Sequence, residues 1–118
     1  MLLKDAIGIK GLQMISFVGA GGKTSAMFRL AKELAETNKK VLISTTTKMY
    51  IPETHDGGKL IVGNSIEQIE DASQLIEHGV MTWAGGKTLN GKISGVLPEY
   101  LDVIYGKENF DFILVEAD

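Results

Sequence analysis

The stretch from Met14 to Ser25 limits what this chain can fold into more than any other part of it. The stretch reads M-I-S-F-V-G-A-G-G-K-T-S, in which an apolar run passes directly into a glycine-rich turn and then into a helix-forming segment. Glycines allow the backbone to fold so that several N–H groups point at one anion, and the N-terminus of the following helix adds partial positive charge. This layout is typical of a phosphate-binding loop.

The residues after the glycines have the types that nucleotide phosphates and their metal require. We expect Lys23 to reach the β- and γ-phosphates and Thr24 to place its hydroxyl on Mg²⁺. The full pattern G-x-x-x-x-G-K-[ST] requires a glycine where this chain has Phe17. The alternative is an ordinary strand-to-helix turn with a solvated lysine, but the order of strand, turn, G-K-T and amphipathic helix favours the phosphate loop. The residues predicted to bind the phosphates of ATP or GTP are Gly19, Ala20, Gly21, Gly22, Lys23, Thr24 and Ser25.

The composition argues against several other classes of function. Of the 118 residues, 44% are hydrophobic and 23% are charged, which is typical of one soluble globular domain. The net charge of −3 and the lack of a run of five like charges argue against nucleic acid or a membrane surface as the main partner. Because the sequence contains no cysteine, it has no disulfide, thiolate metal site or cysteine nucleophile. Residues Met1 to Lys10 lack the layout of a signal peptide, so we expect a cytoplasmic protein.

Apolar periodicity predicts strands and helices that alternate along the chain after a lead-in over Met1 to Gly11, which has room for one helical turn. The first strand is apolar on both faces, as expected of a central parallel strand between two layers of helices. We therefore predict a doubly wound α/β fold with a mostly parallel sheet and helices on both faces. The expected strands are Gln13 to Val18, Val41 to Ser44, Leu60 to Val62, Val80 to Ala84 and Phe110 to Val115, and the expected helices end near Asn38, Gly79 and Gly106.

Start signals and spacing bound these three helices. Ser65 and Gln68 form a capping box for the second helix, and Pro98 is suited to the first position of the third. Helical spacing turns apolar side chains to the sheet and charged side chains to solvent. The inward residues include Leu30 in the first helix, Leu75 in the second, and Leu101, Ile104 and Tyr105 in the third, whereas Glu33 is expected on the outward face of the first.

The segment from Ala84 to Thr88 repeats Ala20 to Thr24 letter for letter. The two copies have different sequence contexts, because Asn90-Gly91 is a strong hairpin signal and the residues after Thr88 lack a helical apolar period. Without a helix N-terminus, the second copy lacks the main part of a phosphate site. We predict that Met81 to Val96 forms a β-hairpin or a small lobe beside the sheet.

Polar residues follow the second strand at the place where α/β proteins bind ligands. Ligands of an open α/β sheet lie beyond the carboxyl ends of its strands. The hydroxyls of Thr45, Thr46 and Thr47 and the ammonium of Lys48 can donate to phosphate or to the shell of a metal ion. Alternatively, these β-branched residues simply extend the strand. The loop from Pro52 to Lys59 contains His55, which we interpret as solvated rather than as a metal ligand or acid–base group.

The last strand ends in two carboxylates, Glu116 and Asp118. Phosphate-loop enzymes use a carboxylate at the end of an apolar strand to hold Mg²⁺ or its water. Either residue can serve, and the alternative is an acidic terminus that is simply solvated. The glycine-rich loop, the threonines and the carboxylates are all expected at the same edge of the sheet, which favours a magnesium site.

Three motifs occur together in this chain: V-G-A-G-G-K-T-S at Val18 to Ser25, S-T-T-T-K-M from Ser44 with Pro52 after it, and L-V-E-A-D at the end. In combination they resemble YqeC-type proteins, which are accessory proteins of selenium-dependent molybdenum hydroxylases. The resemblance spans nearly the whole chain. It implies a P-loop NTPase fold and a role in maturing a labile selenium-containing molybdenum cofactor.

Carried over by position, the resemblance places Gly19 to Thr24 at the phosphates, Thr45 to Lys48 at the nucleotide or substrate edge, and Glu116 and Asp118 near the metal. The V-E-A-D ending also resembles the acidic strand end of dethiobiotin-synthetase-like P-loop proteins, in which the glutamate meets Mg²⁺. That second resemblance favours Glu116 as the metal ligand.

YqeC-type proteins are longer than this chain and continue after the acidic strand. Because a buried last strand leaves its sheet uncovered, we expect residues 1–118 to be one P-loop domain from the N-terminal part of a longer protein. The expected function is Mg²⁺-dependent binding and hydrolysis of ATP or GTP, with Lys23, Glu116 and Asp118 as catalytic residues and a molybdenum hydroxylase or its cofactor as partner. The alternatives are a binder or carrier of a nucleotide-bearing cofactor without turnover, and a small-molecule kinase. This chain contains no [N/T]-K-x-D guanine motif, so the base stays undetermined.

Overall fold

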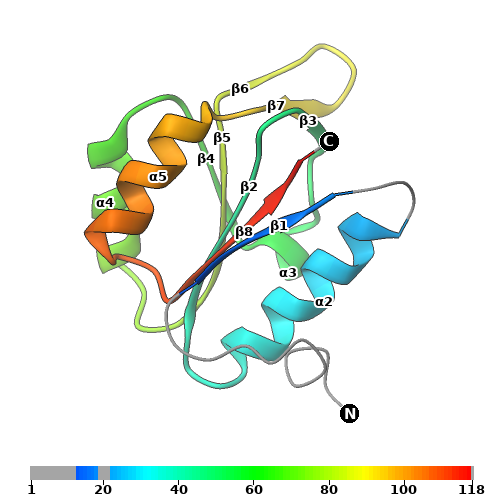
Figure 1. The fold of residues 1–118 in the computed structure, drawn as a ribbon. Helices are drawn as coiled ribbons and strands as arrows, with labels where there is room; N and C mark the ends of the chain where they lie inside the picture. Colours follow the sequence, from blue (N-terminus) through cyan, green and yellow to red (C-terminus); the bar gives the residue numbers. More distant parts are fainter. Residues whose placement is uncertain (1–12, 19–21, 118) are drawn as a thin grey trace.

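The computed structural model describes residues 13–18 and 22–117. Five parallel strands form the central sheet in the order β1, β8, β2, β5, β4, and helices cover it on two faces (Figure 1). This arrangement confirms the predicted α/β class with a mostly parallel sheet. The strands of this sheet are β1 (Gln13–Phe17), β2 (Lys40–Thr45), β4 (Lys59–Val62), β5 (Gly79–Ala84) and β8 (Phe112–Glu116), and the helices are α2 (Lys23–Ala35), α3 (Thr54–Gly57), α4 (Ile66–Gln74) and α5 (Pro98–Lys107).

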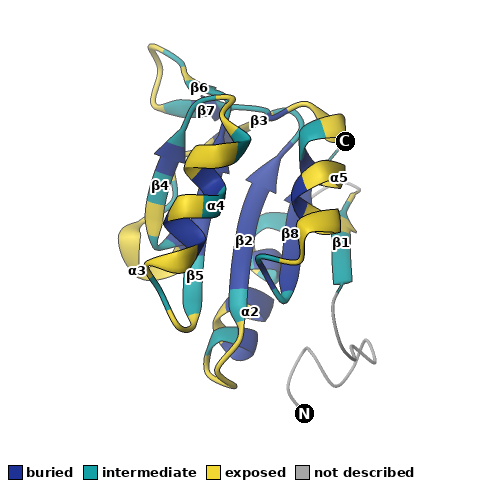
Figure 2. Cartoon of the chain, turned by 90° about the vertical axis from the view of Figure 1, so that its left-hand side faces the viewer, coloured by how far each residue is buried: buried dark blue, intermediate teal, exposed yellow. Residues whose placement is uncertain are grey.

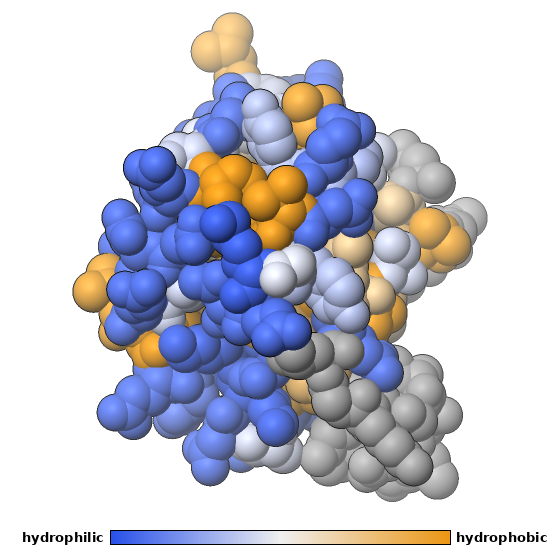
Figure 3. Space-filling view, turned by 60° about the vertical axis from the view of Figure 1, so that its left-hand side comes forward, coloured by the Kyte–Doolittle hydropathy of each residue, from blue (hydrophilic) through white to orange (hydrophobic). Residues whose placement is uncertain are grey.

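Alternation along the central strands builds two cores, one on each face of the sheet. Val41 and Ile43 of β2 belong to the core under α2, whereas Leu42 between them belongs to the core under α4 and α5. This division follows from the two-residue period of a strand. Figure 2 shows β8 and nearly all of β2 buried behind α4 and α5, whose outer surfaces are exposed. The outer surface on the side of α4 and α5 is mostly hydrophilic (Figure 3).

The predicted position of the first strand is wrong. β1 lies at one end of the described sheet and pairs with β8, and its residues are half-buried apart from the exposed Ser16. Met14 packs against one core, and Ile15 and Phe17 pack against the other. Apolar residues on both faces of a strand thus indicate that both faces are covered. They do not indicate whether the strand is central or at the end of the sheet.

Helix α2 matches its predicted apolar stripe, but Glu33 does not lie on the solvated side as expected. Glu33 is 8% exposed. Its carboxylate forms an ion pair with Arg29 one turn earlier, with 3.4 Å between Glu33 Oε2 and Arg29 Nε. Because a charged partner reaches it along the helix, the carboxylate can be buried at the margin of the core.

The second and third helices begin as predicted and end elsewhere. The N–H of Gln68 donates to Ser65 Oγ at 3.2 Å, which confirms the capping interaction. Helix α4 ends at Gln74, so Leu75 is 77% exposed and Gly79 opens β5 instead of ending a helix.

Helix α5 buries Leu101 and Ile104 as predicted, whereas Tyr105 is 41% exposed. Gly106 lies inside this helix rather than after it. The reversal of the chain comes two residues later, where Glu108 adopts the left-handed conformation with φ of 58°.

A second, antiparallel sheet contains β3 (Lys48–Tyr50), β7 (Lys92–Ser94) and β6 (Gly86–Lys87), in the order β3, β7, β6. Its β6–β7 hairpin confirms the predicted lobe, and Gly91 at the turn has φ of 77°. The lobe begins after Ala84 rather than at Met81, because Gly79–Ala84 pairs with β2 and β4 in the central sheet. The second A-G-G-K-T copy leads directly into the turn and strand β7 of this hairpin and not into a helix, as predicted. Strand β3 was not predicted.

Two further predictions concern the loop after Pro52 and the N-terminal lead-in. The predicted loop after Pro52 contains the short helix α3. The helical turn expected within Met1 to Gly11 lies outside the described residues. Within residues 13–18 and 22–117, the structure has no helix long and apolar enough to cross a membrane.

Candidate functional site

Strand register brings three separate parts of the sequence together at the carboxyl edge of the sheet. Glu116 at the end of β8 is paired with Phe17 of β1 on one side and with Thr45 of β2 on the other. The carbonyl of Glu116 accepts a hydrogen bond from the N–H of Thr46 at 3.1 Å. The N–H of Ala117 donates to the carbonyl of Phe17 at 3.0 Å. Glu116 therefore lies between the strand that precedes the glycine-rich loop and the strand that precedes the threonines.

The first turn of α2 is joined to the end of β8 by two side-chain contacts. Thr24 Oγ1 donates to Glu116 Oε2 at 2.6 Å, and Lys23 Nζ donates to the carbonyl of Ala117 at 3.0 Å. Glu116 is 6% exposed, so its carboxylate is held in a poorly hydrated position. A hydrogen bond from a hydroxyl to a carboxylate is shorter and stronger than one between two neutral groups. The Thr24–Glu116 contact is the clearest sign of a site at this edge.

The N-terminus of α2 suits an anion. Gly22 precedes the helix in the left-handed conformation, with φ of 71°, and a Cβ added to it meets nothing within 4 Å. No acidic residue lies in the first turn to neutralise the helix dipole. The first N–H groups of a helix have no partner within the helix and carry its partial positive charge.

The four polar residues after β2 have different surroundings. The hydroxyl of Thr45 is buried, donates to the carbonyl of Glu116 at 3.2 Å and accepts the N–H of Thr47 at 3.1 Å. Thr45 thus stabilises the end of the strand, which agrees with the alternative that the threonines extend β2. Thr46 and Thr47 are half-buried in the bend that follows, and Lys48 is exposed at the start of β3.

Two hollows flank the Thr24 end of α2. The smaller has a volume of about 230 Å³ and is lined by Thr24, Lys48, Met49, Tyr50, Lys92 and Glu116. The larger has a volume of about 360 Å³ and is lined by Thr24, Ser25, Phe28, Arg29, Lys32 and Asp56. Sequence reasoning did not identify Tyr50 or Lys92, because the pairing of β3 with β7 has no local motif. The Asn90-Gly91 turn indicated a hairpin around Lys92 but gave no sign of its third strand.

Several predicted residues are not part of this arrangement as described. Gly19, Ala20, Gly21 and Asp118 lie outside the described residues. His55 is exposed on α3, where its Nε2 lies 3.5 Å from the carboxylate of Asp56. Among the residues that the structure describes, no group of three or more histidine, cysteine or acidic side chains is placed to hold a metal ion. A phosphate-loop magnesium needs no such group, because it uses few protein oxygens together with waters and phosphates.

The Thr24 and Glu116 oxygens fit the demands of Mg²⁺. This ion prefers hard oxygen donors in an octahedron, where adjacent ligands at Mg–O distances of about 2.1 Å lie about 3.0 Å apart. The Thr24 and Glu116 oxygens are 2.6 Å apart, so opening their hydrogen bond by a few tenths of an ångström gives that spacing. One hydroxyl and one carboxylate are also the donor types that such an ion takes from a protein.

The fold and this edge define an α/β protein whose parallel sheet presents a lysine, a hydroxyl and a carboxylate beside one helix N-terminus. A family model described as YqeC protein matches residues 15–118, and the chain therefore belongs to the YqeC family. The curated protein described as uncharacterized protein YqeC of Escherichia coli (strain K12) is 36% identical over 105 residues. The match covers 89% of this chain and 40% of that protein, so the chain spans well under half of its relative's length. No solved structure matches the chain.

Proposed function

We propose that this chain binds ATP or GTP together with Mg²⁺ at the start of α2. The observation that carries the proposal is the 2.6 Å contact between Thr24 and the buried carboxylate of Glu116. A buried carboxylate is costly unless it is paired with a cation or well hydrogen-bonded. Among the described residues, the contacts of Glu116 include no ion pair, which fits a carboxylate reserved for a metal ion.

Each residue has a separate task in this proposal. Lys23 and the first N–H groups of α2 bind the phosphates, and Thr24 and Glu116 hold the metal. The contact of Lys23 with the carbonyl of Ala117 keeps its ammonium beside the sheet edge. Bound Mg²⁺ would neutralise the charge of the phosphates. The residues Gly19, Ala20, Gly21 and Ser25 complete the proposed phosphate loop, and Thr46, Thr47 and Lys48 complete its edge.

Hydrolysis of the nucleotide is the reaction that we propose for this site. Phosphoryl transfer depends mainly on positioning and charge stabilisation, and these are the tasks assigned to Lys23 and to the metal ligands. Asp118 with a water, or Glu116, is the proposed base. Binding without turnover and phosphorylation of a small acceptor are the alternatives. The smaller hollow, which Lys48 and Lys92 line, offers a place for such an acceptor and supports the kinase alternative.

We also propose that the protein assists the maturation of a selenium-dependent molybdenum hydroxylase, acting on that enzyme or on its cofactor in the cytoplasm. Membership of the YqeC family supports this role only through the resemblance of its motifs to those accessory proteins. Because the chain spans 40% of its Escherichia coli relative, the activity of a whole protein of this family is part of the proposal.

The test is to measure ATP and GTP affinity by calorimetry, with Mg²⁺ and with EDTA, in the unchanged protein and in Lys23→Ala. We expect Mg²⁺ to strengthen binding and Lys23→Ala to weaken it. Equal affinity in the two proteins would refute the phosphate loop. Phosphate release then separates hydrolysis from binding alone, and release that depends on an added acceptor identifies a kinase.

A further inference from the structure

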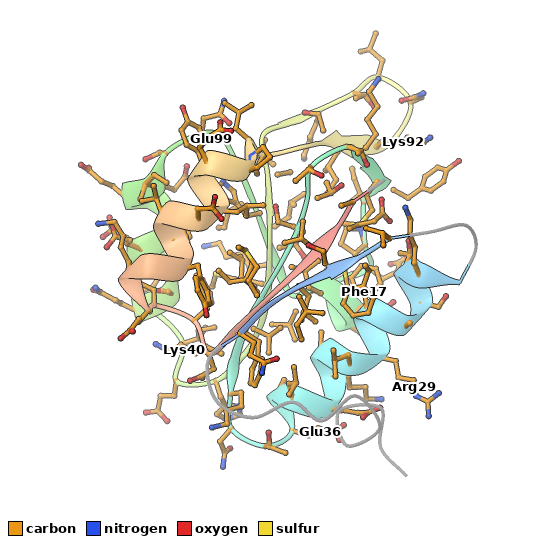
Figure 4. The ribbon with its side chains drawn as sticks, in the orientation of Figure 1. Phe17, Arg29, Glu36, Lys40, Lys92 and Glu99 are labelled. Carbon is orange, nitrogen blue, oxygen red and sulfur yellow. The ribbon has the colours of Figure 1, made fainter. Side chains whose placement is uncertain are left out.

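A cavity separates the Thr24–Glu116 pair from the small sheet, and two lysines line it. Its volume is about 230 Å³, and Lys48, Lys92 and Glu116 all line it. Figure 4 shows Lys92 on the β6–β7 hairpin, at the end of the molecule toward which β1 and β8 run. The β3 residue Tyr50 lines the cavity as well.

Neither lysine is neutralised by a carboxylate in the described part of the chain. No ion pair of Lys48 or Lys92 occurs there, although the structure contains ion pairs of Arg29, His55 and Lys107. Exposed lysines are normally just solvated. Lys92 differs from that case because it is half-buried and its Nζ lies 4.8 Å from the centre of the Tyr50 ring. The aromatic face attracts the ammonium and restricts where it lies.

The small sheet holds this pair in place. Tyr50 is directly opposite Lys92 on the β3–β7 ladder, so the two side chains share a face. The adjacent pair, Met49 and Ile93, is buried in the core beneath α2. The ladder that carries Lys92 is thereby fixed to the same helix that carries Thr24.

We propose that this cavity binds the oxyanion group, a phosphate or a carboxylate, of a second small molecule beside the nucleotide. Lys48 and Lys92 supply the positive charge, and Tyr50 positions Lys92. The volume is below the range of about 300–1,000 Å³ that whole drug-sized ligands occupy, which suits a charged group rather than a second nucleotide. The inference rests on the proposed function, because the negative Glu116 repels an anion unless Mg²⁺ neutralises it.

The experiment titrates inorganic phosphate, and separately acetate, into the protein saturated with Mg²⁺ and a non-hydrolysable ATP or GTP analogue. Amide NMR signals of residues 48–50 and 92–94 report binding at the cavity. We expect saturable shifts with at least one of the two anions, and the anion that responds identifies the group. Replacing Lys92 with alanine should weaken that binding about tenfold, since it removes a charged hydrogen-bond donor.

Two comparisons make the test specific. Lys87→Ala is the matched control, because Lys87 is exposed on the same small sheet and does not line the cavity. Tyr50→Leu should weaken anion binding about two- to fivefold, whereas Tyr50→Phe retains the ring and therefore the affinity. Melting curves confirm that each variant is folded.

The absence of shifts at residues 48–50 and 92–94 with the analogue bound overturns the inference and leaves the proposed function standing. Equal losses in Lys87→Ala and Lys92→Ala also overturn it, because a general surface charge effect then explains the binding. Failure of the analogue itself to bind refutes the proposed function instead, and it is seen separately at the signals of residues 23–25.

Discussion

The hydroxyl of Thr24 lies 2.6 Å from the carboxylate of Glu116, although the two residues are 92 positions apart in the sequence. Thr24 lies in the first turn of the helix after the first strand, and Glu116 ends the strand that pairs with that first strand. The contact joins the first turn of α2 to the end of β8, the strand that lies beside β1. In the proposed function, these two oxygens are the protein ligands of the nucleotide-bound metal ion.

Replacing Thr24 with valine tests the hydroxyl while keeping the shape of the side chain. Because the buried Glu116 loses its hydrogen-bond donor, the free energy of unfolding should fall by about 1–3 kcal/mol without ligand. The variant should also bind nucleotide about tenfold more weakly with Mg²⁺, and about as well as the unchanged protein in EDTA. Thr24→Ser is the control and should retain both properties. Equal Mg²⁺ dependence in the valine variant would exclude Thr24 as a metal ligand.

Replacing Glu116 with glutamine separates stability from metal binding. The amide oxygen still accepts the Thr24 hydrogen bond, and the cost of a buried charge disappears. We expect the ligand-free melting temperature to stay equal or to rise. A nucleotide at a hundredfold excess over its Kd stabilises a protein by about 2.7 kcal/mol, and the variant should lose most of this gain with Mg²⁺. A variant that is stabilised fully by Mg²⁺ and nucleotide would contradict the assignment.

The two G-K-T copies give a direct comparison of lysines. Lys23 lies at the start of a helix, whereas Lys87 lies on a short strand in the hairpin. Lys23→Ala should weaken nucleotide binding about 10- to 100-fold, as expected from the loss of a charged hydrogen bond to phosphate. Lys87→Ala should bind as the unchanged protein does. The reverse pattern would mean that the phosphate site is at the second copy.

A glycine substitution checks the revised end of α5. Gly106 lies within the helix, and a Cβ added to it meets nothing within 4 Å. Gly106→Ala should therefore raise the free energy of unfolding by about 0.5–1 kcal/mol. Gly58→Ala is the contrasting control, because Gly58 has φ of 65° and its added Cβ would clash with the backbone carbonyl of Val80. Loss of stability in Gly106→Ala would indicate that the helix ends at that glycine.

The parts of the fold that could be predicted depend on local signals. The Ser65 cap and the apolar stripe of α2 are set by residues within a few positions of one another, and both agree with the structure. The predicted end of α4 was wrong. Leu75 has the helical spacing of an inward residue, but the helix ends one residue before it and its side chain is exposed.

Lateral order in the sheets could not be predicted from these signals. The edge position of β1 depends on which distant strands pair, and its apolar pattern is the same in either place. The pairing of Tyr50 with Lys92 likewise joins segments more than 40 positions apart. Short strands such as Lys48–Tyr50 contain too few residues for a period to be recognised.

For the candidate site, the sequence identified the residue types, and the structure added their contacts. Glu116 was one of two candidate acids, and the structure brings it to Thr24. Asp118 lies outside the described residues, so its role stays a prediction. The cavity residues Tyr50 and Lys92 have no motif of their own, and only the register of the small sheet reveals them.

The most direct test of the account is to locate the metal ion itself. Paramagnetic Mn²⁺ can replace Mg²⁺ in the complex with ATP or GTP, and it broadens the NMR signals of nearby nuclei. The account predicts nucleotide-dependent broadening centred on Thr24 and Glu116, with little effect at Lys87 on the second G-K-T copy. Broadening centred on the hairpin, or none that depends on nucleotide, would contradict it.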